Sequence, residues 1–251
     1  MAVPPRHIII GDVHGNWQGV VALLEKAAYE PERDKIIFVG DYNDCYAYKH
    51  YSVQKLIDIL LELHDRAPSR TFFVRGNHDL WFSEWLRRGG VPSQIWYIQG
   101  GKETLQSYGI IDDLASQDQR EKVPAAHQEF IINLIRQYYL DERVVVIHGG
   151  FSSEGQMQAV AEDRQLSNSD LEEIVWDRHF VFTNEANAHQ DFKKYFGKRY
   201  LITGHTPEGP YVNPRNPKWI LINSSRWGEI LSAAIIRDEN GYTIIDASCG
   251  I

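Results

Sequence analysis

Residues 7–15 read His-Ile-Ile-Ile-Gly-Asp-Val-His-Gly, a short apolar run followed at once by acidic and imidazole side chains. An apolar run of this length predicts a buried strand, and the flanking glycines let the backbone turn sharply. Four further apolar runs along the chain end in similar polar tails. These tails are residues 40–44, 76–79, 148–150 and 204–206.

The first third of the chain alternates predicted strands with predicted helices. This order is typical of a parallel sheet whose strands are joined by crossover helices. We expect strands at 7–10, 36–39 and 71–74, with helices at 17–28 and 51–64 between them.

The rest of the chain predicts a helical insertion and further strands. Residues 80–140 form the insertion, with helices expected at 80–88, 101–108 and 125–139, whereas 151–198 is polar and poorly periodic. A strand is expected at 143–147. Four further strands are expected at 200–203, 219–223, 230–236 and 242–246, and turn signals between the later ones favour antiparallel pairing. The predicted fold is therefore a mixed α/β (α+β) two-sheet sandwich flanked by helices, with residues 1–251 forming a single domain.

The bulk composition excludes several classes of protein. Hydrophobic residues make up 43% of the 251 residues and charged residues 24%, which is typical of a globular protein. A net charge of −8 disfavours binding to a nucleic-acid polymer. Two cysteines, Cys45 and Cys249, are too few for a disulfide framework and favour a reducing compartment. No apolar run reaches signal-peptide or membrane-span length, so we expect a cytoplasmic protein with no membrane partner. The sequence leaves the oligomeric state open.

The five polar tails predict a metal centre. Ligands of parallel α/β sheets gather at the carboxyl ends of the strands, so the tails should converge. A single tail could be an ordinary turn or a helix cap, but five in succession are hard to explain that way. The donor atoms are oxygen and nitrogen without sulfur, which suits Mn²⁺, Fe or Zn²⁺. Six donors suit two divalent ions that share one carboxylate. The six are Asp12, His14, Asp41, Asn77, His148 and His205.

In this order the tails resemble the motifs of the PPP family of metallophosphatases, within the calcineurin-like superfamily. The family pattern runs GDxHG, GDxxDRG, GNHE or GNHD, HGG or HAG, and GHT. Softer matches occur at Gly100-Gly101, at Thr104-Leu105 and at Trp176 with Arg178. The likeness spans residues 7 to about 236. It is strongest to the compact bacterial and phage-type protein phosphatases and to diadenosine-tetraphosphatase-like enzymes.

The resemblance implies a role for each matching residue. Asp12 and His14 would bind the first metal ion, Asp41 would bridge the two ions, and Asn77, His148 and His205 would bind the second. His78 would act as the general acid that protonates the leaving oxygen, oriented by Asp44. Asn77 and Arg178 would hold the substrate phosphate.

One position departs from the family pattern. An arginine that helps to grip the phosphate normally follows the residue matching Asp44, and this chain has Cys45 there. If residue 45 faces the phosphate, one charge-assisted contact is missing. The aromatic residues Tyr42, Tyr46, Trp81, Trp85 and Trp96 could stack a nucleobase or could fill the core.

The function implied is dinuclear-metal-dependent hydrolysis of a phosphoester, with metal-activated water attacking phosphorus in line. Mn²⁺ is the expected metal, with Fe or Zn as alternatives. The leading hypothesis is a phosphomonoesterase of the Ser/Thr or dual-specificity protein phosphatase type, which acts on a phosphorylated protein or a small phosphoester. The alternatives are a dinucleoside polyphosphate hydrolase or phosphodiesterase, and a non-catalytic binding scaffold of the same fold.

Overall fold

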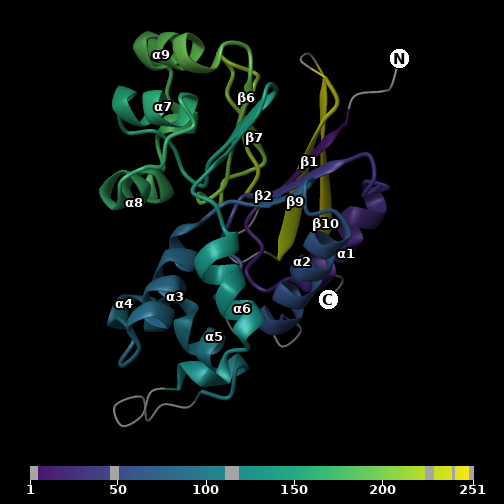
Figure 1. Ribbon diagram of the computed structural model, residues 1–251. Helices are drawn as coiled ribbons and strands as arrows, with labels where there is room; N and C mark the ends of the chain where they lie inside the picture. The colour runs from purple at the N-terminus through teal and green to yellow at the C-terminus, as the bar shows by residue number, and fades with distance from the viewer. Residues whose placement is uncertain (1–4, 46–50, 111–118, 224–228, 239–240, 249–251) are drawn as a thin grey trace.

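The computed structural model describes residues 5–45, 51–110, 119–223, 229–238 and 241–248. Two five-stranded sheets pack face to face, and helices cover the outer face of each sheet (Figure 1). This arrangement confirms the predicted two-sheet sandwich flanked by helices.

The first sheet has the strand order β10-β9-β1-β2-β3. Its three N-terminal strands run parallel, as predicted: β1 (His7–Ile10), β2 (Lys35–Phe38) and β3 (Thr71–Phe73). β9 (Ile230–Ile236) pairs antiparallel with β1, and β10 (Tyr242–Ser248) pairs antiparallel with β9.

The second sheet has the order β4-β5-β6-β8-β7. β5 (Val144–Val146), β6 (Tyr200–Thr203) and β8 (Trp219–Leu221) run parallel at its centre. β4 (Tyr139–Leu140) and β7 (Tyr211–Val212) are short antiparallel strands at the two edges.

The central strands are buried on both faces, which explains their nearly continuous apolar sequence. In β1, Ile8 and Ile10 pack under the helices that cover the first sheet, whereas Ile9 points into the layer between the sheets. All three isoleucines are fully buried. Each strand therefore stabilises two separate apolar clusters at once.

Helices cover the sandwich on both sides. α1 (Trp17–Lys26) and α2 (Val53–Arg66) pack on the first sheet, and α7 (Glu154–Ala161), α8 (Asn168–Trp176) and α9 (Ala186–Phe196) pack on the second (Figure 1). A 3₁₀ turn, η4 (Phe180–Phe182), lies between α8 and α9. Polar side chains cap four of these helices at their first turn, as helix N-termini require: Asn16, Ser52, Ser153 and Ser167.

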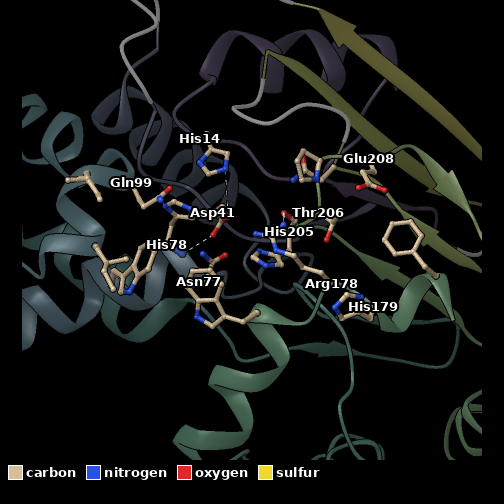
Figure 2. Close-up of a pocket in the computed structure, with 17 residues that line it drawn as sticks. His14, Asp41, Asn77, His78, Gln99, Arg178, His179, His205, Thr206 and Glu208 are labelled. Atoms are coloured by element: carbon tan, nitrogen blue, oxygen red, sulfur yellow. Dashed lines mark hydrogen bonds and ion pairs between the residues drawn. The ribbon is translucent and has the colours of Figure 1, made fainter.

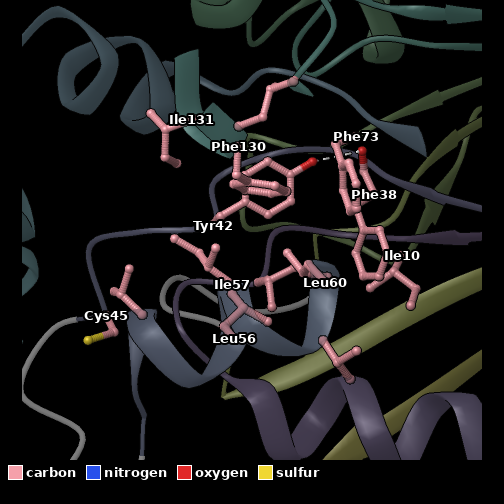
Figure 3. Close-up of a cluster of buried hydrophobic side chains, with 14 of the residues drawn as sticks. Ile10, Phe38, Tyr42, Cys45, Leu56, Ile57, Leu60, Phe73, Phe130 and Ile131 are labelled. Carbon is pink, nitrogen blue, oxygen red and sulfur yellow. Dashed lines mark hydrogen bonds between the residues drawn. The ribbon is translucent and has the colours of Figure 1, made fainter. Parts of the chain in front are cut away.

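The insertion begins directly after β3 with α3 (Asn77–Arg88). It continues through short helical pieces, namely α4 (Gln94–Trp96), η1 (Tyr97–Gly101), α5 (Lys102–Ser107), η2 (Arg120–Lys122), α6 (Ala125–Glu129) and η3 (Phe130–Leu134). Its aromatic side chains extend the core of the first sheet: Phe130 packs against Tyr42 and Phe73 (Figure 3), and Phe82 belongs to the same buried cluster. The helical insertion predicted for residues 80–140 is therefore present.

The helix predicted at 125–139 is too long. The helical residues end at Leu134, and Tyr139 begins β4. Between them the chain runs beside β3: Arg136 N donates to Phe73 O and Arg75 N donates to Arg136 O, both at 2.8 Å. Backbone pairing with an existing sheet edge therefore replaces the last helical turn.

Two further differences from the prediction concern the second half of the chain. The poorly periodic stretch 151–198 contains α7, α8 and α9, which have only 8, 9 and 11 residues and so carry little periodic signal. β8 runs parallel to β6 and not antiparallel, because β7 first carries the chain back along the sheet. The antiparallel prediction is correct for β9 and β10.

Across the described segments, every helix is too short or too polar to cross a lipid bilayer.

A polar node joins the two sheets at the end where β1 and β2 begin. The Asp141 carboxylate, 11% exposed, accepts hydrogen bonds from His7 Nε2 at 2.6 Å, Lys35 Nζ at 2.7 Å and Tyr139 Oη at 2.8 Å. Its other oxygen accepts the backbone N–H of Arg143 at 2.9 Å. Burial alone would raise the pKa of Asp141, but the hydrogen bonds from His7 and Lys35 outweigh it and hold the pKa well below its usual range.

We expect Asp141→Asn to lower the free energy of unfolding at neutral pH by about 2–3 kcal/mol, because hydrogen bonds to a charged group are lost. A carboxyl whose folded pKa is depressed stabilises the fold above its unfolded pKa and loses that contribution as pH falls. The difference between variant and wild type should therefore shrink below about pH 4. Urea unfolding at several pH values measures this. Asp65→Asn is the control, because that side chain is 84% exposed. An equal loss of stability in Asp141→Asn and Asp65→Asn would show that the hydrogen bonds to Asp141 do not stabilise the fold.

Candidate metal centre

The structure brings together all six residues predicted to bind metal. Figure 2 labels four of them, namely His14, Asp41, Asn77 and His205. Asp12 follows β1, Asp41 follows β2, Asn77 begins α3 after β3, His148 follows β5 and His205 follows β6. The parallel strands of both sheets therefore end at one place. Each of the six residues is at most 6% exposed: Asp12, His14, Asp41, Asn77, His148 and His205.

Their donor atoms form two overlapping groups. Oxygen and nitrogen atoms of Asp12, His14 and Asp41 lie within 4.8 Å of one another, and so do those of Asp41, His148 and His205. Asp41 belongs to both groups, which is the position of a bridging carboxylate. Asn77 Oδ1 lies 3.1 Å from His148 Nε2 and so joins the second group.

Backbone carbonyls orient two of the imidazoles. His14 Nδ1 lies 3.0 Å from Asn43 O, and His148 Nδ1 lies 3.0 Å from Val39 O. A carbonyl can only accept a hydrogen bond, so each Nδ1 carries a proton and each Nε2 is the ring nitrogen that could coordinate a metal ion. Both Nε2 atoms face Asp41 Oδ2, at 3.7 Å and 3.3 Å. A hydrogen bond from one ring nitrogen to a carbonyl, with the other nitrogen left free, is typical of metal-binding histidines.

Two buried donor atoms in the cluster have no hydrogen-bond partner among the described residues. They are Asp12 Oδ1 and His205 Nε2. Burial raises the pKa of Asp12 to about 7 and lowers the pKa of His205 to about 2, so this imidazole is neutral. A buried lone pair without a partner is unfavourable, and a bound cation would satisfy both atoms. The donor set therefore fits divalent metal.

The loops that carry these residues are held in unusual conformations. Six described residues other than glycine have positive φ, and four of them lie here: His14, Asp41, Asp44 and His205, with φ from 44° to 64°. Such conformations are costly for residues with a Cβ atom and persist only where the surroundings impose them. Close packing restricts the same loops: a Cβ atom at Gly76 would lie 2.1 Å from Asp41 Oδ1, so only glycine fits there.

His78 and Asp44 form a buried pair beside the cluster. His78 Nδ1 donates to Asp44 Oδ2 at 2.6 Å. Asp44 also accepts hydrogen bonds from Trp96 Nε1 at 2.9 Å and from Thr104 Oγ1 at 2.6 Å, and it is fully buried. Burial alone would lower the pKa of His78, but the carboxylates of Asp41 and Asp44 outweigh it and raise the pKa. The imidazole thus has one ring nitrogen fixed by Asp44 and the other available.

A cavity of about 1040 Å³ opens over the cluster. His78, Asn77 and Arg178 all line it, so the predicted substrate-binding residues and the predicted acid face the same cavity (Figure 2). The rim is partly apolar. Trp81 and Trp176 pack with ring centroids 5.2 Å apart, and the exposed side chains of Ile95 and Ile98 lie nearby on the lining.

Cys45 does not face this cavity. It belongs to the hydrophobic cluster under α2 and is 7% exposed (Figure 3). Burial raises the pKa of its thiol to about 11. Among the aromatic residues whose role was open, Trp81 lines the cavity, whereas Tyr42, Trp85 and Trp96 lie in the core and Tyr46 is outside the described residues.

The sequence did not identify three residues that support the cluster. Asn223 follows β8 and donates from Nδ2 to Asp12 Oδ2 at 2.6 Å. Asn223 directly follows an apolar run, as the polar tails do, and this position in the sequence could have marked it as a site residue. Trp96 was expected to stack a base or fill the core, and Thr104 was only a soft motif match. No sequence pattern around Trp96 or Thr104 predicts a hydrogen bond to Asp44.

The chain is similar in sequence to known phosphoesterases. Residues 5–209 match the family model described as calcineurin-like phosphoesterase. The chain is 27% identical to a bis(5'-nucleosyl)-tetraphosphatase PrpE of Geobacillus thermodenitrificans over 214 residues, which cover 79% of this chain and 78% of that protein.

Protein phosphatases are also similar. A protein phosphatase 2A catalytic subunit of Dictyostelium discoideum is 24% identical over 77% of this chain, and the match spans 57% of that longer protein. A Saccharomyces cerevisiae serine/threonine phosphatase structure superposes with a TM-score of 0.66 at 13% identity, covering 100% of this chain and 82% of that one. That likeness establishes the fold.

We expect Asp41→Asn to lower the content of both metal ions, because its carboxylate belongs to both donor groups. His78→Asn should retain the metal, since His78 lies outside both groups. Elemental analysis of each desalted protein by mass spectrometry gives metal per chain, with Asp65→Asn as the control. Wild-type metal content in Asp41→Asn would contradict the shared carboxylate. Loss of metal in His78→Asn would contradict its place outside the donor set.

Proposed function

Because the chain belongs to the calcineurin-like phosphoesterase family and is a metal-dependent phosphoester hydrolase, we propose that it is a phosphomonoesterase of the protein phosphatase type. The proposed substrates are phosphorylated proteins or small phosphomonoesters. The observation that carries this proposal is the His78–Asp44 pair beside the clustered metal donors.

We assign one divalent ion to Asp12, His14 and Asp41, and a second to Asp41, Asn77, His148 and His205. Two divalent cations supply charge neutralisation on the phosphate and a lowered pKa for water at this kind of site. The oxygen and nitrogen donors favour Mn²⁺, with Fe or Zn as alternatives. In this proposal the attack on phosphorus is in line.

His78 would protonate the leaving oxygen. Its Nδ1 is occupied by Asp44, so the ring nitrogen Nε2 is the atom that can deliver a proton into the cavity. The alkoxide of a serine or threonine side chain is a poor leaving group and needs such a proton. A nucleotide phosphate is a better leaving group and gains less from an acid. The buried pair therefore favours an alkyl phosphomonoester.

Arg178 and Asn77 would position the phosphate. Arg178 lies on the cavity wall, close enough to His205 for its Nη1 to donate to His205 O at 3.4 Å. A guanidinium offers a planar pair of donors that matches two phosphate oxygens. Asn77 Nδ2 is the donor end of a side chain whose Oδ1 faces His148.

A second candidate is hydrolysis of dinucleoside polyphosphates. It is favoured by the PrpE relative, whose length this chain matches closely. The exposed part of the Trp81–Trp176 pair could also stack a nucleobase at the cavity rim.

Loss of the acid should depend on the leaving group. His78→Asn should reduce kcat for phenyl phosphate by about 10²–10⁴-fold and for p-nitrophenyl phosphate by much less. Thr104→Val, which removes one donor to Asp44, should show the same trend with a loss of roughly tenfold. Thr104→Ser keeps the hydroxyl and is the matched control. Equal losses on both esters would show that His78 does not protonate the leaving oxygen.

A substrate panel separates the two candidate functions. With Mn²⁺ present, kcat/KM should be highest for a phosphoserine peptide, lower for p-nitrophenyl phosphate, and lowest for bis(p-nitrophenyl) phosphate and a dinucleoside tetraphosphate. Trp176→Leu should affect these substrates to a similar degree. A preference for the dinucleoside tetraphosphate, lost selectively in Trp176→Leu, would favour the second candidate instead.

A further inference from the structure

A second cavity, of about 550 Å³, lies between the chain that follows β3 and the start of α8. Three arginines from separate segments line it: Arg75 after β3, Arg87 on α3 and Arg136 after η3. Its lining contains one carboxylate, Asp163, which accepts a hydrogen bond from Tyr138 Oη at 3.2 Å. The cavity wall is therefore positively charged on a chain whose net charge is −8.

None of these three guanidinium groups forms an ion pair with a described carboxylate. Within the described residues, no carboxylate oxygen lies within 4.0 Å of any of them. Arg75 is only 5% exposed. Its Nη2 donates to Ile131 O at 3.0 Å and Ile135 O at 3.1 Å, but its buried Nη1 has no partner in the described part of the chain. The buried carboxylate of Asp79 acts on Arg75 electrostatically but makes no ion pair with it, so a bound anion would give Nη1 the partner that it lacks.

The other two arginines can reach the same ligand. Arg87 and Arg136 are exposed. Arg87 donates to Ser83 Oγ at 3.3 Å and to Ile132 O at 3.2 Å, and Arg136 lies over the ring of Phe72 at 5.1 Å. These contacts are weak or neutral, so an anion can replace them at little cost. Arg136 is also tied to Arg75 through the backbone, at 2.8 Å from Arg75 N to Arg136 O.

The start of α8 borders the cavity, and the carboxylate of Asp170 in the same first turn offsets part of its helix dipole. Asn168 and Leu171, both in its first turn, line the cavity, and Ser167 caps the helix. A helix N-terminus presents free backbone N–H groups and the positive end of the helix dipole.

We propose that this cavity is a second anion site, separate from the catalytic cavity, that binds a phosphoryl group. Arginine guanidiniums match phosphate oxygens in geometry as well as in charge. The volume lies within the range of about 300–1,000 Å³ found for small-molecule pockets, so the group can be free orthophosphate or part of a larger phosphorylated molecule. Its lining includes Arg75, which directly precedes Gly76 in the chain, and the proposal does not depend on the reaction assigned to the catalytic cavity.

Calorimetric titration of the metal-loaded protein with orthophosphate tests the proposal. The wild type should bind phosphate at two sites, and Asp41→Asn should keep the second one. The double variant Arg87→Gln, Arg136→Gln should bind at the second site at least about tenfold more weakly, since charge-assisted contacts are lost. Arg88→Gln is the matched control, because Arg88 is the next residue on α3, is 78% exposed and does not line this cavity. Melting curves establish that each variant is folded.

Phenylphosphonate, whose carbon–phosphorus bond is not a phosphoester, distinguishes the two sources of the phosphoryl group. Tighter binding of phenylphosphonate than of orthophosphate at the second site identifies a larger phosphorylated molecule as the ligand, and weaker binding identifies orthophosphate. If the folded double variant titrates like the wild type with both ligands, the cavity is not an anion site.

Discussion

The carboxylate of Asp79 joins the two loops on which the centre depends. It accepts the backbone N–H groups of Gly76 at 2.8 Å, Asp41 at 2.9 Å and Tyr42 at 3.0 Å, and it is fully buried. In return, the side chain of Asp41 accepts the N–H of His78 at 3.0 Å. The loop after β2 and the loop after β3 therefore fix each other. Because Asp41 and Asn77 carry donors and His78 is the proposed acid, this reciprocal arrangement sets the distance between metal ligands and acid.

The helical insertion is part of the same assembly. Asp44 is seated by Trp96 and Thr104, which come from the insertion. Gly100 packs so closely that a Cβ atom there would lie 2.7 Å from Asp44 Cβ, and its φ of 102° also requires glycine.

The residues proposed to bind metal lie at one end of the sandwich, and the polar node around Asp141 lies at the other. At the carboxyl ends of the strands, four residues have positive φ, and Asp12 Oδ1 and His205 Nε2 have no partner among the described residues. At the opposite end, hydrogen bonds satisfy both carboxylate oxygens of Asp141.

The sequence predicted the parts of the fold that depend on local patterns. The parallel strands β1, β2 and β3 are short and mostly apolar, and each leads into a polar tail, so both the sheet and the convergence of Asp12, Asp41 and Asn77 could be inferred. The parts that depend on tertiary contacts could not. The direction of β8 depends on β7, two residues long. The contact of Trp96 with Asp44 spans 52 positions, and the arginine-lined cavity joins residues from 75 to 171.

The central claim is that two metal ions share Asp41 at the carboxyl ends of the strands. Anomalous diffraction from crystals grown with Mn²⁺ tests it most directly. The account predicts two anomalous peaks on either side of the Asp41 carboxylate, one beside Asp12 and His14 and the other beside Asn77, His148 and His205. A single peak, or peaks that do not contact Asp41, would contradict it.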